Sequence, residues 1–133
     1  MMFVRESDYL DTGNTLTTFE IDNVKIGLGI GFDLLHSELA TLYRKAGCDV
    51  LIYPAAFPAD LGIIQWEQLN RTRAIDNQVF VVGVSPARDD TNRFVAYGHS
   101  MLVDPRGRVL VRGFDKEEIL YTDLGKILVF FSI

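Results

Sequence analysis

Three short apolar segments alternate along this chain with two segments of helical periodicity, and this order limits the fold more than any other feature. The apolar segments cover residues 24–30, 49–53 and 78–84, and the helical segments cover residues 37–46 and 63–77. Strand–helix–strand units of this length predict a mostly parallel sheet. The expected fold class is therefore α/β.

Antiparallel strands are expected on both sides of this pattern. Residues 17–21 are predicted to form a strand that turns at Asp22 and Asn23 into the first apolar segment. After residue 94 the helical pattern stops, and further strands are predicted at 94–104, 108–112 and 119–123. No repeat, low-complexity tract or linker interrupts the 133 residues, so a single domain spanning residues 1–133 is predicted.

Charge and cysteine content exclude several classes of function. Thirteen basic and eighteen acidic residues give a net charge of −5, and no basic patch is present that could neutralise phosphates, so no nucleic acid partner is expected. Cys48 is the only cysteine, which excludes an internal disulfide, a thiolate zinc site and a CxxC redox pair. No cofactor or metal is predicted. The N-terminus does not resemble a signal peptide and no segment has membrane-spanning length, so a cytoplasmic location without membrane attachment is expected.

Each helical segment has a predicted apolar face. In the first it consists of Leu39, Ala40, Leu42, Tyr43 and Ala46, and in the second of Ile64, Trp66, Leu69, Arg73 and Ile75. An arginine on an apolar face needs a partner for its charge. We therefore predict that Arg73 is buried in a structural ion pair with Glu38, or alternatively with Asp33.

Gly27, Gly29 and Gly31 alternate along the first apolar segment. Their spacing does not match a dinucleotide-binding fingerprint, because Phe32 holds the place of the third glycine and the glycines lie within the strand. Glycines on one face of a strand instead indicate that another backbone or a ligand approaches closely there. Cys48 is predicted to be a small buried side chain, while a catalytic pair with His36 or His99 stays open as an alternative.

Four longer segments carry a family resemblance. In order and spacing they resemble the C-terminal half of the carbon–nitrogen hydrolases of the nitrilase superfamily, over residues 6–124, and SPARDD and YGHS are most similar to the omega-amidase branch. The segments are GLGIGFDLLHSELA, AGCDVLIYPAAF, WEQLNRTRAIDNQVFVVGVSPARDD and YGHSMLVDPRGRVL.

The resemblance implies an α-β-β-α sandwich, present here in part, and a cysteine–glutamate–lysine site that forms a thioester. It implies hydrolysis of the terminal amide of α-ketoglutaramate or α-ketosuccinamate to a dicarboxylate and ammonia. The family segment Gly-Ile-Cys-aromatic-Asp reads Gly29-Ile30-Gly31-Phe32-Asp33 here, so Gly31 stands at the nucleophile position. The glutamate and lysine belong to the preceding half of family members.

Further expectations follow from the same resemblance. Phe32, Asp33, Phe57 and Trp66 are expected to belong to the substrate pocket, and the backbone N–H of Phe32 is the expected oxyanion donor. Leu35 stands where relatives usually have an arginine. We predict that this chain is catalytically inactive. The alternatives are a non-enzymatic module that forms homo- or heterodimers with a full-length relative through its helices, and relocated chemistry at Cys48.

The strands and the end of the chain suggest association. Without a second sheet, the segments VKIGLGI and DVLIYP are expected to present apolar faces or unpaired edges to water. Residues 127–133, ILVFFSI, form an uncharged apolar run of a kind that pairs or aggregates. The isolated chain is therefore expected not to be a stable monomer.

Overall fold

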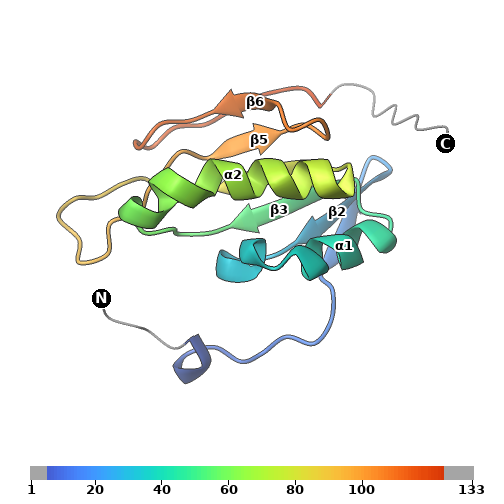
Figure 1. Cartoon of the computed structure of the whole chain (residues 1–133), viewed down its shortest axis with the longest axis horizontal. Helices are drawn as coiled ribbons and strands as arrows, with labels where there is room; N and C mark the ends of the chain where they lie inside the picture. Colours follow the sequence, from blue (N-terminus) through green and yellow to red (C-terminus); the bar gives the residue numbers. More distant parts are fainter. Residues whose placement is uncertain (1–5, 125–133) are drawn as a thin grey trace.

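A six-stranded mixed sheet with helices on one face makes up the described part of the chain, residues 6–124 of a computed structural model (Figure 1). The strands lie side by side in chain order, and β2, β3 and β4 are parallel whereas the outer pairs are antiparallel. The strands are β1 (Thr18–Ile21), β2 (Val24–Leu28), β3 (Val50–Pro54), β4 (Phe80–Val84), β5 (Met101–Val103) and β6 (Val109–Arg112). This confirms the predicted α/β class with a parallel centre.

Three helices connect the parallel strands. The 3-10 helix η2 (Gly31–Leu35) and the α-helix α1 (Ser37–Lys45) lie between β2 and β3, and the α-helix α2 (Ala59–Asn77) lies between β3 and β4. A further 3-10 helix, η1 (Glu6–Asp8), precedes β1. Helix α1 begins at the predicted residue and ends one residue before the predicted end. It has an acidic residue in its first turn and basic residues in its last, which is the favourable arrangement for the helix dipole. Helix α2 begins four residues before the predicted start, directly after Pro58, and ends at Asn77, followed by Gln78 as a left-handed C-cap.

The turn between β1 and β2 has the predicted residues in a hairpin geometry. Asp22 and Asn23 both have positive φ, 48° and 64°. Two consecutive residues of this kind form a type I′ turn, whose twist matches that of the flanking strands. The prediction of a two-residue hairpin is confirmed.

The predicted apolar face of α2 is wrong in part. Ile64 and Ile75 are 62% and 45% exposed, whereas Asn70 and Asn77 are buried. The two asparagines can be buried because their side-chain amides donate to carbonyls of the preceding turn, those of Trp66 and Arg73. In α1, Leu42 is likewise exposed, which differs from its predicted place on the buried face.

Two apolar clusters cover the two faces of the sheet. The cluster under the helices is the larger one and contains Leu51, Tyr53, Trp66 and Val81. On the opposite face Ile26, Val50, Phe80 and Leu102 are only 3–8% exposed. The expectation that this sheet presents apolar faces to water is therefore wrong for its central strands. The edge strand β1, by contrast, is exposed along its whole length.

Two of the strands predicted after residue 94 differ from the structure. The predicted strand at 119–123 is irregular, with Ile119 and Tyr121 exposed. In the predicted strand at 94–104 only β5 is a strand of the sheet, because the preceding residues form a loop that makes one isolated bridge, Ala96 to Pro58. Half-buried Leu124 packs against the cluster opposite the helices. The apolar run at 127–133 lies outside the described residues.

Candidate functional site

Gly31 lies in the turn after β2, at the carboxyl end of the parallel strands. It is the first residue of η2 and has φ +54°, in the left-handed region. The loops after β3 and β4 leave the sheet at the same end, because the three strands are parallel. Open α/β sheets bind their ligands at this end of the strands. The structure thus places the predicted nucleophile position, Gly31, at the end of the sheet where folds of this type bind their ligands.

Backbone and side-chain hydrogen bonds fix the turn around Gly31. The N–H of Gly29 donates to the carbonyl of Ile52, 3.0 Å away. The carboxylate of Asp33 accepts the N–H of Ile30 at 2.9 Å, and the N–H of Asp33 donates to the carbonyl of Ile30 at 3.0 Å. Asp33 therefore closes the turn, a structural contact in addition to its expected place in the pocket.

The N–H groups of Gly31 and Phe32 come before the first hydrogen bond of η2, which the N–H of Asp33 makes to Ile30. The first N–H groups of a helix have no acceptor within the helix. The N–H of Phe32 thus has the position that suits the predicted oxyanion donor. The side chain of Phe32 is 40% exposed beside it.

An aromatic row connects Phe32 to the interior. The rings of Phe32 and Phe57 meet edge to face with centroids 5.3 Å apart, and those of Phe57 and Trp66 are 5.2 Å apart. The indole N–H of Trp66 donates to the carbonyl of His99 at 2.8 Å. The structure brings three of the predicted pocket residues together. Phe57 and Trp66 are fully buried, however, so in this structure they support Phe32 and line no open space.

Two tyrosines that the sequence did not single out pack against the glycines of β2. A β-carbon at Gly27 would lie 2.6 Å from the Tyr43 ring, and one at Gly29 would lie 2.6 Å from the Tyr53 ring. The hydroxyl of Tyr43 donates to the carbonyl of Leu28 at 2.6 Å. The close approach at these glycines is therefore made by side chains of α1 and β3, and not by the backbone or ligand that was predicted.

Arg73 is buried, as predicted, but the predicted ion pair is wrong. Its side chain is 6% exposed, and its guanidinium donates at 3.0 Å to the carbonyls of Leu34 and Leu35. No salt bridge between described residues joins Arg73 to Glu38 or Asp33. The pKa of Glu38 is lowered mainly by a hydrogen bond from its own backbone, and Arg73 has only a weak electrostatic effect on it. The carbonyls at the end of η2 can hold the guanidinium because they have no acceptor role within the helix.

Cys48 is fully buried, as predicted for a structural cysteine. Burial raises the pKa of its thiol, which opposes formation of the nucleophilic thiolate. Cys48 also precedes β3 and so lies at the amino end of the parallel strands, opposite to the Gly31 turn. The structure gives no support to relocated chemistry at this residue.

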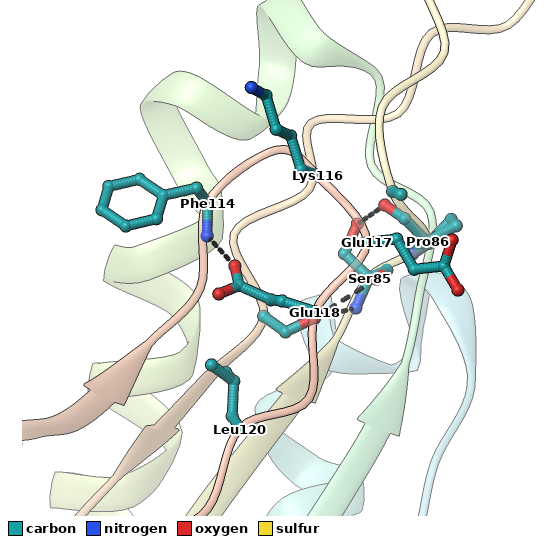
Figure 2. Close-up of a pocket in the computed structure, with 9 residues that line it drawn as sticks. Ser85, Pro86, Phe114, Lys116, Glu117, Glu118 and Leu120 are labelled. Atoms are coloured by element: carbon teal, nitrogen blue, oxygen red, sulfur yellow. Dashed lines mark hydrogen bonds between the residues drawn. The ribbon is translucent and has the colours of Figure 1, made fainter.

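A cavity of about 180 Å³ lies at the end of β4, and no sequence pattern indicated it (Figure 2). Glu118 reaches back to accept the backbone N–H of Phe114, and the hydroxyl of Ser100 bonds to both backbone groups of Ser85. None of the predicted site residues lines it. The lining residues are Ser85, Pro86, Ala87, Ser100, Phe114, Lys116, Glu117, Glu118 and Leu120.

Residues 6–124 contain neither a cluster suited to a metal ion nor a helix suited to a membrane. Within this range no three His, Cys, Asp or Glu side chains come together as a metal site. None of the helices in it combines the length and the apolar character needed to cross a membrane.

Comparison with known proteins agrees with the family resemblance. The family model described as carbon-nitrogen hydrolase matches residues 3–126. The chain is 48% identical to the omega-amidase NIT2 of Mus musculus and 45% identical to that of Homo sapiens, over 120 residues, which are 90% of this chain and 44% of each relative. It therefore spans less than half the length of these relatives.

A solved structure of the same superfamily has a similar fold. The Nit3 protein of Saccharomyces cerevisiae, a member of branch 10 of the nitrilase superfamily, matches with a TM-score of 0.81 and 42% identity, covering 85% of this chain and 42% of that one. The mixed sheet with two α-helices is thus the nitrilase fold over part of its length. On its sequence and its fold, this chain belongs to the carbon–nitrogen hydrolase family.

Proposed function

We propose that this chain carries part of an omega-amidase-like site in which glycine replaces the nucleophile, and that these 133 residues alone hydrolyse no amide. The observation that carries the proposal is Gly31 itself. It lies at the carboxyl end of β2 with φ +54°, in the turn where the resemblance has a cysteine. The identity of 48% to an omega-amidase supports the substrate class, the terminal amides of small α-keto acids such as α-ketoglutaramate and α-ketosuccinamate.

The chemistry of amide hydrolysis explains why glycine stops the reaction. A thiolate would attack the amide carbonyl, ammonia would leave, and water would hydrolyse the thioester to the acid. Glycine offers no atom for the bond to the carbonyl carbon. The N–H of Phe32 can still donate to a carbonyl oxygen, but stabilising an oxyanion has no effect where no oxyanion forms. The resemblance places neither the glutamate base nor the lysine within this chain.

A chimera tests the assignment of Gly31 directly. Residues 6–124 would replace the matching part of the mouse omega-amidase, once with Gly31 and once with Gly31→Cys, and ammonia release from α-ketoglutaramate would be measured. The expected result is activity of the Gly31→Cys chimera and none of the chimera that keeps glycine. A folded Gly31→Cys chimera without activity would contradict the assignment, and activity of the Gly31 chimera would contradict the predicted inactivity.

A second candidate function is that of a dimerisation partner for a full-length relative. The helix layer supports it, because Leu42 of α1 and Ile63 and Ile64 of α2 are exposed large aliphatic side chains. Apolar side chains on a surface of this kind favour association. Sedimentation of this chain mixed with a full-length relative should give a heterodimer, and Ile63→Lys should weaken it. Tyr121→Lys, at an even more exposed position outside the helices, is the control.

A further inference from the structure

The segment YGHS, residues 97–100, contains two consecutive residues with left-handed backbone, and the proposed function gives this segment no role. Gly98 has φ +78° and His99 has φ +61°. Left-handed backbone is uncommon in residues other than glycine. It persists where the surrounding structure holds it, and it is concentrated at functional sites. The conformation of His99 therefore points to contacts that this segment has to make.

The neighbours of His99 hold it in this conformation. Its ring stacks on that of Tyr97, with centroids 4.2 Å apart and an angle of 19° between the planes. Its Nδ1 lies 2.8 Å from the carbonyl oxygen of Tyr97, and its backbone N–H donates to the carbonyl of Phe114 at 2.8 Å. At Gly98 a β-carbon would lie 2.8 Å from the α-carbon of Asp115, so only glycine fits there. Both the ring and the backbone of the histidine are thus restrained.

The segment bonds to both buried residues of the aromatic row. The N–H of Tyr97 donates to the carbonyl of Phe57 at 2.9 Å, and the carbonyl of His99 accepts the indole N–H of Trp66 at 2.8 Å. These two bonds, made two residues apart in the chain, fix Phe57 and Trp66 relative to each other. The backbone angles of His99 set the direction of its carbonyl. Its left-handed conformation is therefore what places the acceptor at the indole.

The aromatic row transmits this restraint to the Gly31 turn. Phe57 and Trp66 are 1% and 0% exposed, and their ring centroids are 5.2 Å apart, so neither ring has free space around it. The other side of Phe57 meets the edge of Phe32, 5.3 Å away. Phe32 follows Gly31 directly, and its N–H is the expected oxyanion donor. A ring that is held in place restrains the backbone to which it is attached.

We propose that His99 is a positioning residue for the Gly31 turn. Its left-handed backbone, held by stacking on Tyr97, directs the carbonyl that fixes Trp66, and the aromatic row then holds Phe32 in place. His99 acts through Trp66 and Phe57 and is not a catalytic residue. The proposal rests on the proposed function in one respect, which is that the Gly31 turn is the site.

Thiol labelling of the full chain carrying Gly31→Cys tests the proposal. The introduced thiol reports the state of the turn, and Cys48, which is fully buried in the cluster under the helices, reports whether the fold is intact. His99→Ala removes the ring that holds the left-handed backbone, so the carbonyl should leave the indole. The thiol at position 31 should then react several-fold faster with a small alkylating reagent, while Cys48 stays protected. An unchanged rate at position 31 would overturn the proposal.

Gln78→Ala is the matched control. Gln78 also has left-handed backbone, φ +54°, and its side chain also bonds to a nearby backbone carbonyl, that of Ile75 at 2.7 Å. It precedes β4, at the amino end of the parallel strands, whereas the Gly31 turn lies at the carboxyl end. Gln78→Ala should leave labelling at position 31 unchanged. Equal acceleration by the two alanine variants would assign the effect to a general loss of stability and overturn the proposal.

Two further variants distinguish positioning from a simple loss of packing. Asparagine accepts left-handed backbone better than alanine does, so His99→Asn should restore part of the protection at position 31. Trp66→Phe keeps a ring in the row but removes the N–H that the carbonyl of His99 accepts. Combined with His99→Ala it should add little, because both changes break the same link. Equal labelling of the Asn and Ala variants, or rates that multiply in the combined variant, would contradict the proposal.

Fast labelling of Cys48 would show that His99→Ala has unfolded the chain, and Tyr97→Leu then takes its place. This change removes the ring on which His99 stacks and leaves residue 99 itself intact. Faster labelling at position 31 with Cys48 protected supports the proposal, and an unchanged rate overturns it. Labelling requires no turnover. An inactive Gly31→Cys chimera would therefore contradict the proposed function alone.

Discussion

The guanidinium of Arg73 donates to the carbonyl of Leu34 at 3.0 Å, and this contact ties the middle of α2 to the end of the Gly31 turn. A second bond of the same length reaches the carbonyl of Leu35. In this chain the arginine is held by backbone oxygens instead of a carboxylate. Removing the guanidinium therefore leaves the two carbonyls without their donor, but it leaves no buried carboxylate without a counter-charge.

Arg73→Met is expected to lower the free energy of unfolding by about 2–4 kcal/mol, because two charge-assisted hydrogen bonds to buried backbone are lost. Urea unfolding gives the value. Arg44→Met, at an exposed position in the last turn of α1, is the control and should stay within about 0.5 kcal/mol. Glu38→Gln should lower the unfolding midpoint only slightly, because it removes the negative charge from the first turn of α1. A loss as large as that of Arg73→Met would restore the ion pair.

Gly31→Ala is expected to destabilise the chain by about 1–2 kcal/mol, because a β-carbon is strained at φ +54°. Gly31→Asn should cost less, since asparagine tolerates left-handed backbone better than alanine does. The difference between the two variants in urea unfolding is the readout. Equal unfolding midpoints for the two variants would mean that the turn relaxes when a side chain is added.

Gly31→Cys in this chain, without any other part of a relative, is expected to release no ammonia from α-ketoglutaramate. Catalytic groups that act as a unit fail together, so the thiol without its base and oxyanion lysine gives no turnover. The assay compares it with Gly31→Ser and with the unchanged chain. Ammonia release specific to the cysteine variant would place the other catalytic groups within these residues.

The strand–helix order and the hairpin could be predicted because both depend on local signals. Apolar spacing distinguishes strands from helices, and Asp22 and Asn23 are residues that accept positive φ. The buried face of α2 could not be predicted from polarity, since Asn70 and Asn77 are buried by bonding to their own helix. The partners of Arg73 could not either, because a sequence does not reveal which backbone carbonyls are left unpaired.

In the candidate site, too, some residues could be predicted from the sequence and others could not. Gly31 and Phe32 could be placed through the family resemblance. In the structure the rings of Phe32, Phe57 and Trp66 form one row, and their role in a substrate pocket stays a prediction. The support of the turn by Tyr43 and Tyr53 depends on contacts between α1, β3 and β2 that only the fold brings together. Alternating glycines were the one available signal, and they indicated the approach of a backbone or a ligand instead of tyrosine side chains.

Gly27→Ala and Gly29→Ala are expected to lower stability by about 1–3 kcal/mol each, because the new methyl group overlaps a tyrosine ring that is itself packed. Gly13→Ala is the matched control, since no atom lies within 4 Å of its added carbon. Thermal unfolding of the three variants gives the comparison. If Gly29→Ala matched Gly13→Ala, the Tyr53 ring would have room to move.

The hydroxyl of Tyr53 is buried and has no hydrogen-bond partner among the described residues. A buried hydroxyl without a partner costs free energy, so Tyr53→Phe should be neutral or slightly stabilising at neutral pH. Tyr43→Phe is the contrast, because the Tyr43 hydroxyl donates to the carbonyl of Leu28, and its removal should cost about 1 kcal/mol.

The same hydroxyl makes stability depend on alkaline pH, since burial raises the pKa of Tyr53. In the unfolded chain a tyrosine ionises near pH ~10, whereas the folded chain keeps Tyr53 protonated to higher pH. The contribution is therefore fully present below pH ~10 and is lost as pH rises above it, because the unfolded state releases its proton first. Urea unfolding between neutral and alkaline pH should show a steeper loss for the unchanged chain than for Tyr53→Phe. Parallel pH profiles would mean that water reaches the hydroxyl in the folded state.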